Sequence, residues 1–307
     1  MGETYLVRAE LEFGWDFEKG EDEKSSKTLK QLPIEFGPFR LDWSPNSEFY
    51  LMDLGWLEPD YKGDSHPDWE YPVSLLYIET KVEGQHPERA ADDILELLEA
   101  MLRLFQEGDV YLRRHEHMWN LKDGTPEVVI SIRHRPIKSE PATLYRRGAY
   151  RMDDETLGKF IDFFNCYWNI IHQKPQPLYN AMSRFSSSYE KRTLADRLVE
   201  LVIALEALFG DRSDSLTYKI ALRCSSLLYP PGETRKKVFK AIKEVYADRS
   251  AIVHGGRLDS KYSNEKIDQL EDYIRRSIPK FLEQYKKGNP LTSGEELDEL
   301  LFFFGNE

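Results

Sequence analysis

Residues 233–256 have the sequence ETRKKVFKAIKEVYADRSAIVHGG, which predicts one long helix that ends at a pair of glycines. Apolar residues recur along this stretch at helical spacing: Val238, Ile242, Val245, Ile252 and Val253. Gly255 and Gly256 are typical of a helix C-terminal cap, so we expect His254 in the last turn. The stretch therefore predicts a helix with one buried apolar row.

Arg249 interrupts this apolar row. A guanidinium in a buried row is costly unless it has an anionic partner or borders a surface that admits an anion. Tyr246, Ser250 and His254 form the neighbouring row, so the imidazole leaves the helix about 140° around from Arg249, a gap that a long arginine side chain can close. Histidine exchanges protons near neutral pH and is suited to proton transfer. Arg249 and His254 are the candidate catalytic pair.

The rest of the chain divides into two patterns. Residues 1–150 predict an α+β domain, with strands at 4–13, 73–82 and around 109–114 and 127–134, a helix at 87–106, and charged or proline-rich loops at 18–31 and 57–70. Residues 151–307 predict an all-α bundle, with helices at 154–173, 177–188, 191–209, 215–229, 233–254, 264–286 and 294–303. We therefore expect an α+β N-terminal domain followed by a helical domain.

Composition excludes several classes of protein. Of the residues, 40% are hydrophobic and 31% charged, and no apolar run approaches the ~20 residues that span a bilayer, so we expect a cytoplasmic protein without a membrane segment or secretion signal. The two cysteines, Cys166 and Cys224, are far apart, which excludes a disulfide framework and a zinc ribbon and favours small buried roles. Phosphate-binding glycine loops and a G-x-S-x-G motif are absent from the sequence.

Two clusters of histidine and acid do not amount to a predicted metal site. His115 and His117 would share one face of a strand, and Asp64, His66 and Asp68 alternate in the same way. Neither cluster has a second ligand group at a metal-binding spacing. The sequence therefore predicts neither a metal nor another cofactor.

The net charge of −12 conceals two basic segments. Residues 109–151 contain nine Lys and Arg against five acids, and residues 233–261 contain eight against four, so each segment carries +4. Cations interleaved with aromatic residues are typical of surfaces that bind single strands, although the solvated face of a sheet has the same composition. The candidate RNA contacts are Arg113, Arg114, Arg133, Arg135, Arg146, Arg147, Lys236 and Lys240.

Three blocks in the C-terminal half resemble a known family. They are RLVELVIALEALFG (197–210), LTYKIALRCSSLL (216–228) and VYADRSAIVHGG (245–256), and they are similar to the Apea-like branch of HEPN domains, with Arg249 and His254 in the family's Arg, four to six residues, His motif. The resemblance implies a helical bundle that dimerises so that both Arg/His pairs face one groove and cut RNA without metal. It does not extend to residues 1–150.

The resemblance also implies roles. His254 would act as acid or base toward the ribose 2′-hydroxyl or the leaving 5′-oxygen, and Arg249 would stabilise the charge that grows on phosphorus. The product would be a 2′,3′-cyclic phosphate, and DNA would escape cleavage. Such proteins often serve as prokaryotic antiviral defence or toxin effectors, so RNA, a second copy of the chain and a regulatory protein are the expected partners.

Four further residues are candidates for supporting roles. Glu206 lies in an apolar helix, where a buried acid needs a cation, and Arg223 is the candidate partner, either in a structural ion pair or in a group that orients Arg249. Tyr246 and Ser250 neighbour the catalytic pair. The alternative to a nuclease is a HEPN-like dimer without catalysis, which serves as a scaffold or an RNA-binding module.

Overall fold

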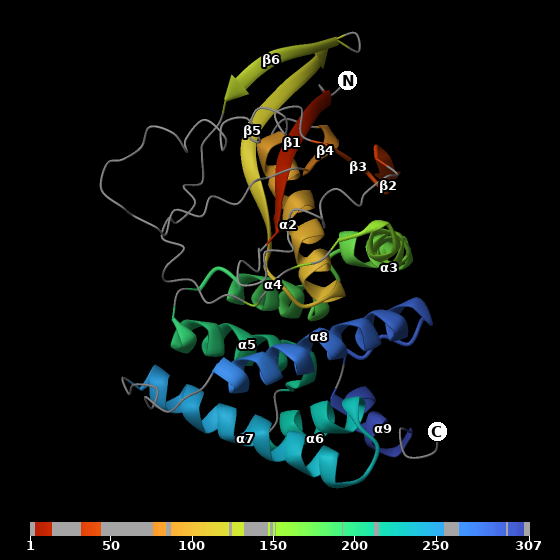
Figure 1. Cartoon of the computed structure of the whole chain (residues 1–307). Coiled ribbons are helices and arrows are strands. Elements are labelled where there is room, and N and C mark those ends of the chain that lie inside the picture. The colour runs from red at the N-terminus through yellow and green to blue at the C-terminus, as the bar shows by residue number, and fades with distance from the viewer. Residues whose placement is uncertain are drawn as a thin grey trace, which may run out of the picture. The chain divides into compact units, whose positions relative to one another are not determined.

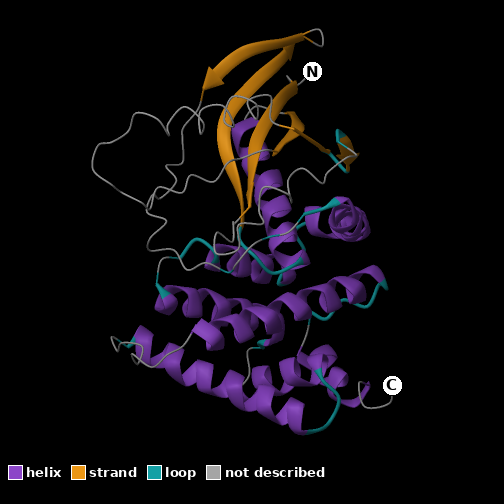
Figure 2. Cartoon of the chain, viewed as in Figure 1, coloured by secondary structure: helices purple, strands orange, loops and turns teal. Residues whose placement is uncertain are grey.

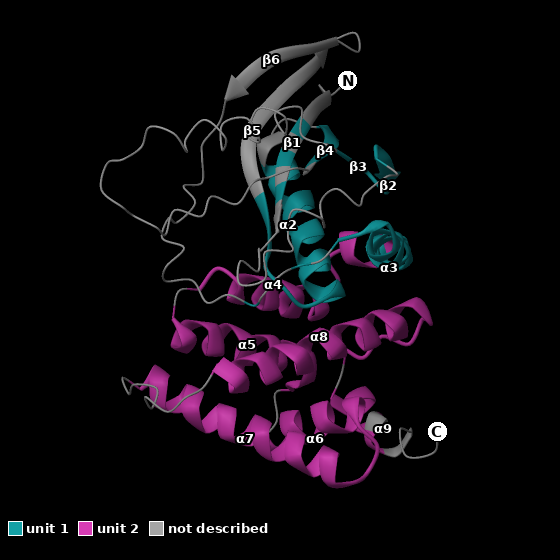
Figure 3. Ribbon diagram, in the orientation of Figure 1, with its two compact units in different colours: residues 1–168 teal, residues 169–307 magenta. Residues whose placement is uncertain are grey.

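A computed structural model of the chain describes residues 4–13, 32–43, 76–83, 87–122, 125–131, 147, 150, 152–191, 193–211, 215–254, 264–292 and 294–303. The chain forms two compact units, residues 1–168 and 169–307 (Figure 3). Strands occur in the first unit, and the described part of the second is helical (Figure 2). The expected succession of an α+β region and a helical region is confirmed. The predicted loops at 18–31 and 57–70 lie outside the described residues.

The first unit contains an antiparallel sheet with the strand order β2-β3-β4-β1-β5-β6. Its strands are β1 (Thr4–Phe13), β2 (Ile34–Phe36), β3 (Phe39–Trp43), β4 (Leu76–Glu83), β5 (Val110–Lys122) and β6 (Thr125–Ser131). The four predicted strands are confirmed, β1 with the predicted limits and the other three with shifted ends, whereas the short β2–β3 hairpin was not predicted. Its turn requires Gly37, which has a φ of +52° and packs so closely on Phe164 that a Cβ would collide with the ring.

Helix α2 (Pro87–Phe105) packs on the sheet through its apolar face. Arg103 at its end is fully buried, and its guanidinium pairs with Glu99 at 2.7 Å and donates to the carbonyl of Val110. Glu99 also accepts the backbone N–H of Leu112 at 3.0 Å. These bonds give the buried charges of Arg103 and Glu99 hydrogen-bond partners, and they fix the helix to the first residues of β5.

Helix α3 (Asp154–His172) belongs to the first unit as far as Trp168. Phe160 and Phe164 make edge-to-face contacts with Phe36, at 5.9 and 5.0 Å between ring centroids. Because this aromatic cluster packs α3 beside the β2–β3 hairpin, the two compact units divide after Trp168. The sequence pattern grouped α3 with the later helices instead, because only helices follow it.

Asp153 caps α3, and its removal should weaken the helix. Its carboxylate accepts the backbone N–H of Thr156 at 2.7 Å, and this bond lowers the pKa of Asp153. We expect Asp153→Ala to lower the free energy of unfolding by at most ~1 kcal/mol, since the site is exposed. The stabilisation is complete above the unfolded pKa of about 3.9 and is lost as the pH falls through the lower folded pKa. Urea denaturation at pH 7 and pH 3 should show a smaller difference at pH 3 than at pH 7; an equal loss at both pH values would contradict a charged cap.

The second unit is a bundle of α4 (Leu178–Ser188), α5 (Leu194–Phe209), α6 (Leu216–Leu228), α7 (Glu233–Val253), α8 (Asn264–Lys286) and α9 (Gly294–Phe303). These helices confirm the predicted ones within three residues at each end. Figure 1 shows α6 and α7 side by side, next to a layer that contains α5 and α8. A buried ion pair between Arg197 and Glu271, 2.6 Å long, joins α5 to α8. Among the described helices, none has the length and apolar content that crossing a membrane requires.

Candidate functional site

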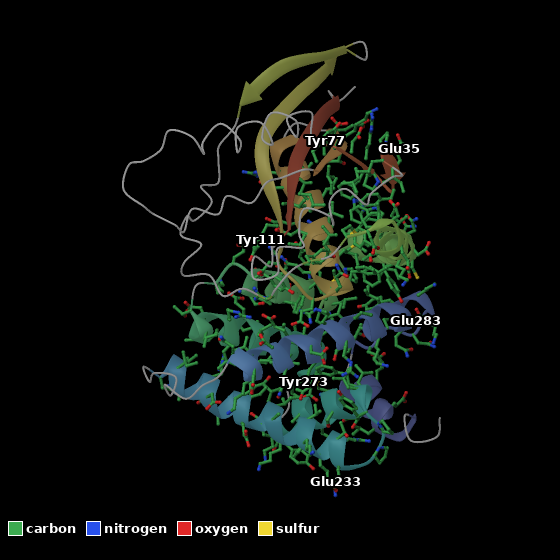
Figure 4. The ribbon with its side chains drawn as sticks, in the orientation of Figure 1. Glu35, Tyr77, Tyr111, Glu233, Tyr273 and Glu283 are labelled. Atoms are coloured by element: carbon green, nitrogen blue, oxygen red, sulfur yellow. The ribbon has the colours of Figure 1, made fainter. Side chains whose placement is uncertain are left out.

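Helix α7 ends one residue before the predicted limit at residue 254. Its last residue is Val253, and His254 is the C-cap, with a φ of −87° and a backbone N–H that bonds to the carbonyl of Ser250 at 3.2 Å. The His254 side chain is exposed, and no hydrogen bond or ion pair to a described residue occupies its imidazole. The imidazole is therefore open to an external partner. Figure 4 labels Glu233, which begins the same helix at its other end.

Arg249 is half-buried and has no counter-ion within the described part of the chain. Its Nε is buried and lacks a hydrogen-bond partner. An unsatisfied buried donor costs roughly 1 to 3 kcal/mol, and more when it is charged. A site with this cost is suited to an anion that arrives from outside, such as a phosphate.

Arg249 and His254 leave α7 on different sides. Arg249 shares its side with the buried residues Val238, Ile242 and Val245, whereas His254 is exposed. Five residues correspond to about 140° around a helix, as the sequence indicated. Among the described contacts, Arg249 and His254 do not bond to each other. The structure therefore places the two side chains near one helix end without a contact between them.

Tyr246 is the buried neighbour of Arg249. Its side chain is 8% exposed, and no described residue makes a hydrogen bond with its hydroxyl. Burial raises the pKa of Tyr246 far above its ordinary range, the charge of Glu206 raises it further, and the charge of Arg249 lowers it. Glu206 on α5 thus acts electrostatically on the same hydroxyl as Arg249. Three of the predicted residues belong to one neighbourhood.

The predicted ion pair between Glu206 and Arg223 is wrong. Arg223 is fully buried and pairs with Asp211 and Asp298, each at 2.8 Å. Its guanidinium also donates to the carbonyls of Phe209 and Gly294. The side chain extends past the end of α5 toward α9, so it joins α5, α6 and α9 and has no contact with the candidate pair.

The prediction that Arg147 contacts RNA is also wrong. Its side chain is only 2% exposed and lies 3.7 Å from the carboxylate of Asp109, which also accepts the backbone N–H of Arg147 at 2.9 Å. A guanidinium enclosed with its counter-ion is unavailable to a phosphate.

The other candidate RNA contacts fall into three groups. Lys236 and Lys240 are exposed on α7. Arg113 and Arg114 lie on β5, where only the backbone is described. The remaining candidates, Arg133, Arg135 and Arg146, lie outside the described residues.

The described part of the molecule offers neither a metal-binding cluster nor a reactive thiol at Cys224. The structure shows no cluster of three His, Cys, Asp or Glu side chains among the residues it describes, although the side chains of His115 and His117 and all of residues 64–68 lie outside that description. Cys224 is fully buried, as predicted, and burial raises the pKa of its thiol to about 12, so it is inert at neutral pH. Cys166 is half-buried.

Comparisons of the chain with family models, with curated proteins and with solved structures gave no match.

Sequence reasoning missed two features of this unit. Asp211 and Asp298, which bind Arg223, lie 12 and 75 residues away from it, a separation that no local pattern connects. It also missed the surface formed by Tyr218, Phe239 and Lys243 beside the predicted Lys236 and Lys240. The signal for that surface was present, because residues 236, 240 and 243 follow helical spacing.

The buried hydroxyl of Tyr246, which bonds to none of the described residues, should lower the stability of the fold. We expect Tyr246→Phe to raise the free energy of unfolding by ~1 kcal/mol, because it removes a buried polar group that has no partner. Tyr189→Phe is the matched control, since the equally enclosed Tyr189 hydroxyl accepts a hydrogen bond from Arg275 at 3.0 Å and its loss should destabilise the protein. Urea denaturation of both variants measures the difference. A loss of stability in both would show that the Tyr246 hydroxyl has a partner.

Proposed function

We propose that this chain is a metal-independent endoribonuclease of the HEPN type, with Arg249 and His254 as its catalytic residues. The observation that carries the proposal is the state of these two groups. Among the residues that the structure describes, the guanidinium of Arg249 has no carboxylate partner and its buried Nε has no hydrogen bond, and the imidazole of His254 is exposed five residues later. A cation without a counter-ion beside an open proton carrier suits a phosphodiester substrate.

The chemistry requires no cofactor. A base removes the proton of the ribose 2′-hydroxyl, the 2′-oxygen attacks phosphorus, and the bond from phosphorus to the 5′-oxygen breaks as that oxygen receives a proton. His254 carries protons in this exchange, and Arg249 stabilises the negative charge that develops on the phosphorane oxygens. The products are a 2′,3′-cyclic phosphate and a 5′-hydroxyl. DNA lacks the nucleophile and is not cut.

A second copy of the chain completes the site in this proposal. Because Arg249 and His254 point about 140° apart on one helix, a phosphate reaches both more easily when two copies supply them. Val253, directly before His254, is 54% exposed, which supports an apolar contact between copies close to the site. Mixing the inactive Arg249→Ala and His254→Ala proteins should then restore part of the activity, because a mixed dimer retains one Arg249 and one His254.

The test uses the whole chain with a single-stranded RNA and its DNA equivalent, both in EDTA. Cleavage of RNA alone, with 2′,3′-cyclic phosphate ends identified by mass spectrometry, supports the proposal. Loss of cleavage in both Arg249→Ala and His254→Ala assigns it to the pair. An inert parent protein that still forms dimers would instead support the non-catalytic scaffold.

A further inference from the structure

We propose that the exposed face of α7 is a binding track for a single strand of RNA that ends at His254. This α7 track consists of Lys236, Phe239, Lys240, Lys243 and His254, together with Tyr218 of the adjoining α6. The inference rests on the proposed function only in naming RNA, since the same surface chemistry suits single-stranded DNA.

The cations of the track form one stripe. At 100° per residue, Lys240, Lys243 and His254 all lie within about 40° of Lys236 around the helix axis. All four side chains are exposed. The acids of α7, Glu233, Glu244 and Asp248, lie about 60° to 120° round to one side, so no carboxylate of the helix falls on the stripe. A polyanion laid along the stripe would therefore meet cations, with Glu233 and Glu244 at one edge in exposed pairs with Lys236 and Lys240.

The lysines are held only by weak surface contacts. Lys236 pairs with Glu233 at 2.7 Å and Lys240 with Glu244 at 3.9 Å, in pairs whose side chains are at least half exposed. Exposed pairs of this kind contribute about 0 to 1 kcal/mol, so a phosphate can replace the carboxylate. Lys243 has its Nζ 5.6 Å from the centre of the Phe239 ring.

Aromatic rings border the stripe on the side away from the acids. Phe239 lies about 60° from Lys236 on that side. Tyr218 of α6 meets Phe239 edge to face, at 5.3 Å and 79°, and remains 51% exposed. It is one of two large apolar side chains exposed in the described residues, the other being Val253 beside His254. The exposed ring of Tyr218 beside a row of cations favours nucleobases over an acidic protein or a lipid surface, because bases stack on aromatic faces.

The track has the length of an RNA segment. From residue 236 to residue 254, α7 rises about 27 Å. That distance corresponds to roughly eight stacked nucleotides of one strand. A strand that lies along the lysines would bring one of its phosphates to His254.

The experiment separates binding from cleavage. The protein carries His254→Ala, so the RNA stays whole, and binding of a fluorescein-labelled 12-nucleotide RNA is followed by anisotropy from 50 to 300 mM salt. We expect Lys236→Gln, Lys240→Gln and Lys243→Gln together to weaken binding at least ~10-fold at low salt and to reduce the salt slope by about 2, since each phosphate contact contributes about 0.7.

A matched control removes three charges elsewhere. Lys159, Lys280 and Lys287 are exposed and lie on other helices or their ends. Their joint replacement by Gln should change affinity less than about twofold, because none of the three lies on the α7 track. Gel filtration and thermal unfolding of each variant check dimerisation and folding.

Tyr218 tests the stacking part of the proposal. Tyr218→Leu should weaken binding of the single strand at least ~5-fold, whereas Tyr218→Phe should retain it, because only the aromatic face is needed. Duplex RNA, whose bases are already stacked, should be insensitive to both changes. A single-stranded DNA of equal sequence should bind through the same residues.

Each contrary outcome has a distinct meaning. No binding by the parent, or binding that the lysine and Tyr218 variants leave unchanged, overturns the track. Variants that alter the oligomeric state and leave RNA affinity intact would make this face a contact between copies, and binding to anionic vesicles in place of RNA would make it a lipid surface. Track-dependent binding without RNA cleavage by the unaltered chain would retain the track and refute the nuclease.

Discussion

His254→Ala is expected to lower the rate of RNA cleavage at least ~100-fold while leaving the thermal midpoint of unfolding unchanged. The rate falls because general acid-base catalysis by a positioned histidine contributes about 10²- to 10⁴-fold. The fold is spared because the imidazole is exposed and bonded to none of the described residues. The measurement is single-turnover cleavage of a labelled RNA in EDTA, with protein in excess.

A second histidine provides the control for this prediction. His172 ends α3 and is also exposed, so His172→Ala removes the same side chain at a site without a proposed role. We expect its rate to equal that of the parent. Equal rates for all three proteins would remove His254 from the chemistry and leave the Arg249 environment as a structural feature.

Arg223→Met is expected to lower the free energy of unfolding by ~3 kcal/mol. The change deletes a fully buried guanidinium that joins three helices and pairs with Asp211 and Asp298. Asp211 keeps Lys219 as a second cation, at 3.4 Å. Breaking a buried pair usually costs about 3 to 5 kcal/mol, and the lower value applies here because Asp298 is 45% exposed and can regain water. Urea denaturation measures the loss.

A double-mutant cycle distinguishes the observed partner of Arg223 from the one expected from sequence. Arg223→Met combined with Asp211→Asn should show a coupling energy of about 1 kcal/mol or more, because the two side chains are in contact. The same cycle with Glu206→Gln should give none. Coupling to Glu206 instead of Asp211 would contradict the arrangement of α5, α6 and α9.

The sequence predicted the helices well because each has an amphipathic period and a clear end. Residues 264–286 and 294–303 were predicted with the limits that α8 and α9 have. The β2–β3 hairpin was missed because strands of three and five residues are too short to establish an alternating pattern. Its packing against α3 could not be predicted either, because Phe36 and Phe164 are separated in the sequence by several strands and by α2.

The site was predictable in its position and less so in its contacts. Arg249 interrupts an apolar row, which indicated a guanidinium with an anionic partner or beside a surface that admits an anion, and the glycines after His254 placed this histidine in the last turn of the helix. Partners were not predictable, because they depend on how helices pack: Arg223 turns to Asp211, and Arg147 is enclosed with Asp109. Charge counts likewise could not distinguish Arg147, which is buried, from Lys236, which is exposed.

The central claim is that one RNA phosphate reaches both Arg249 and His254. It is tested most directly by NMR of protein labelled with ¹⁵N at arginine and histidine, titrated with an RNA strand whose 2′-hydroxyls are methylated so that it binds without being cut. We expect the Nε–H signal of Arg249 and the imidazole signals of His254 to shift together, with one dissociation constant. An Arg249 signal that stays fixed while the RNA saturates the protein would contradict it.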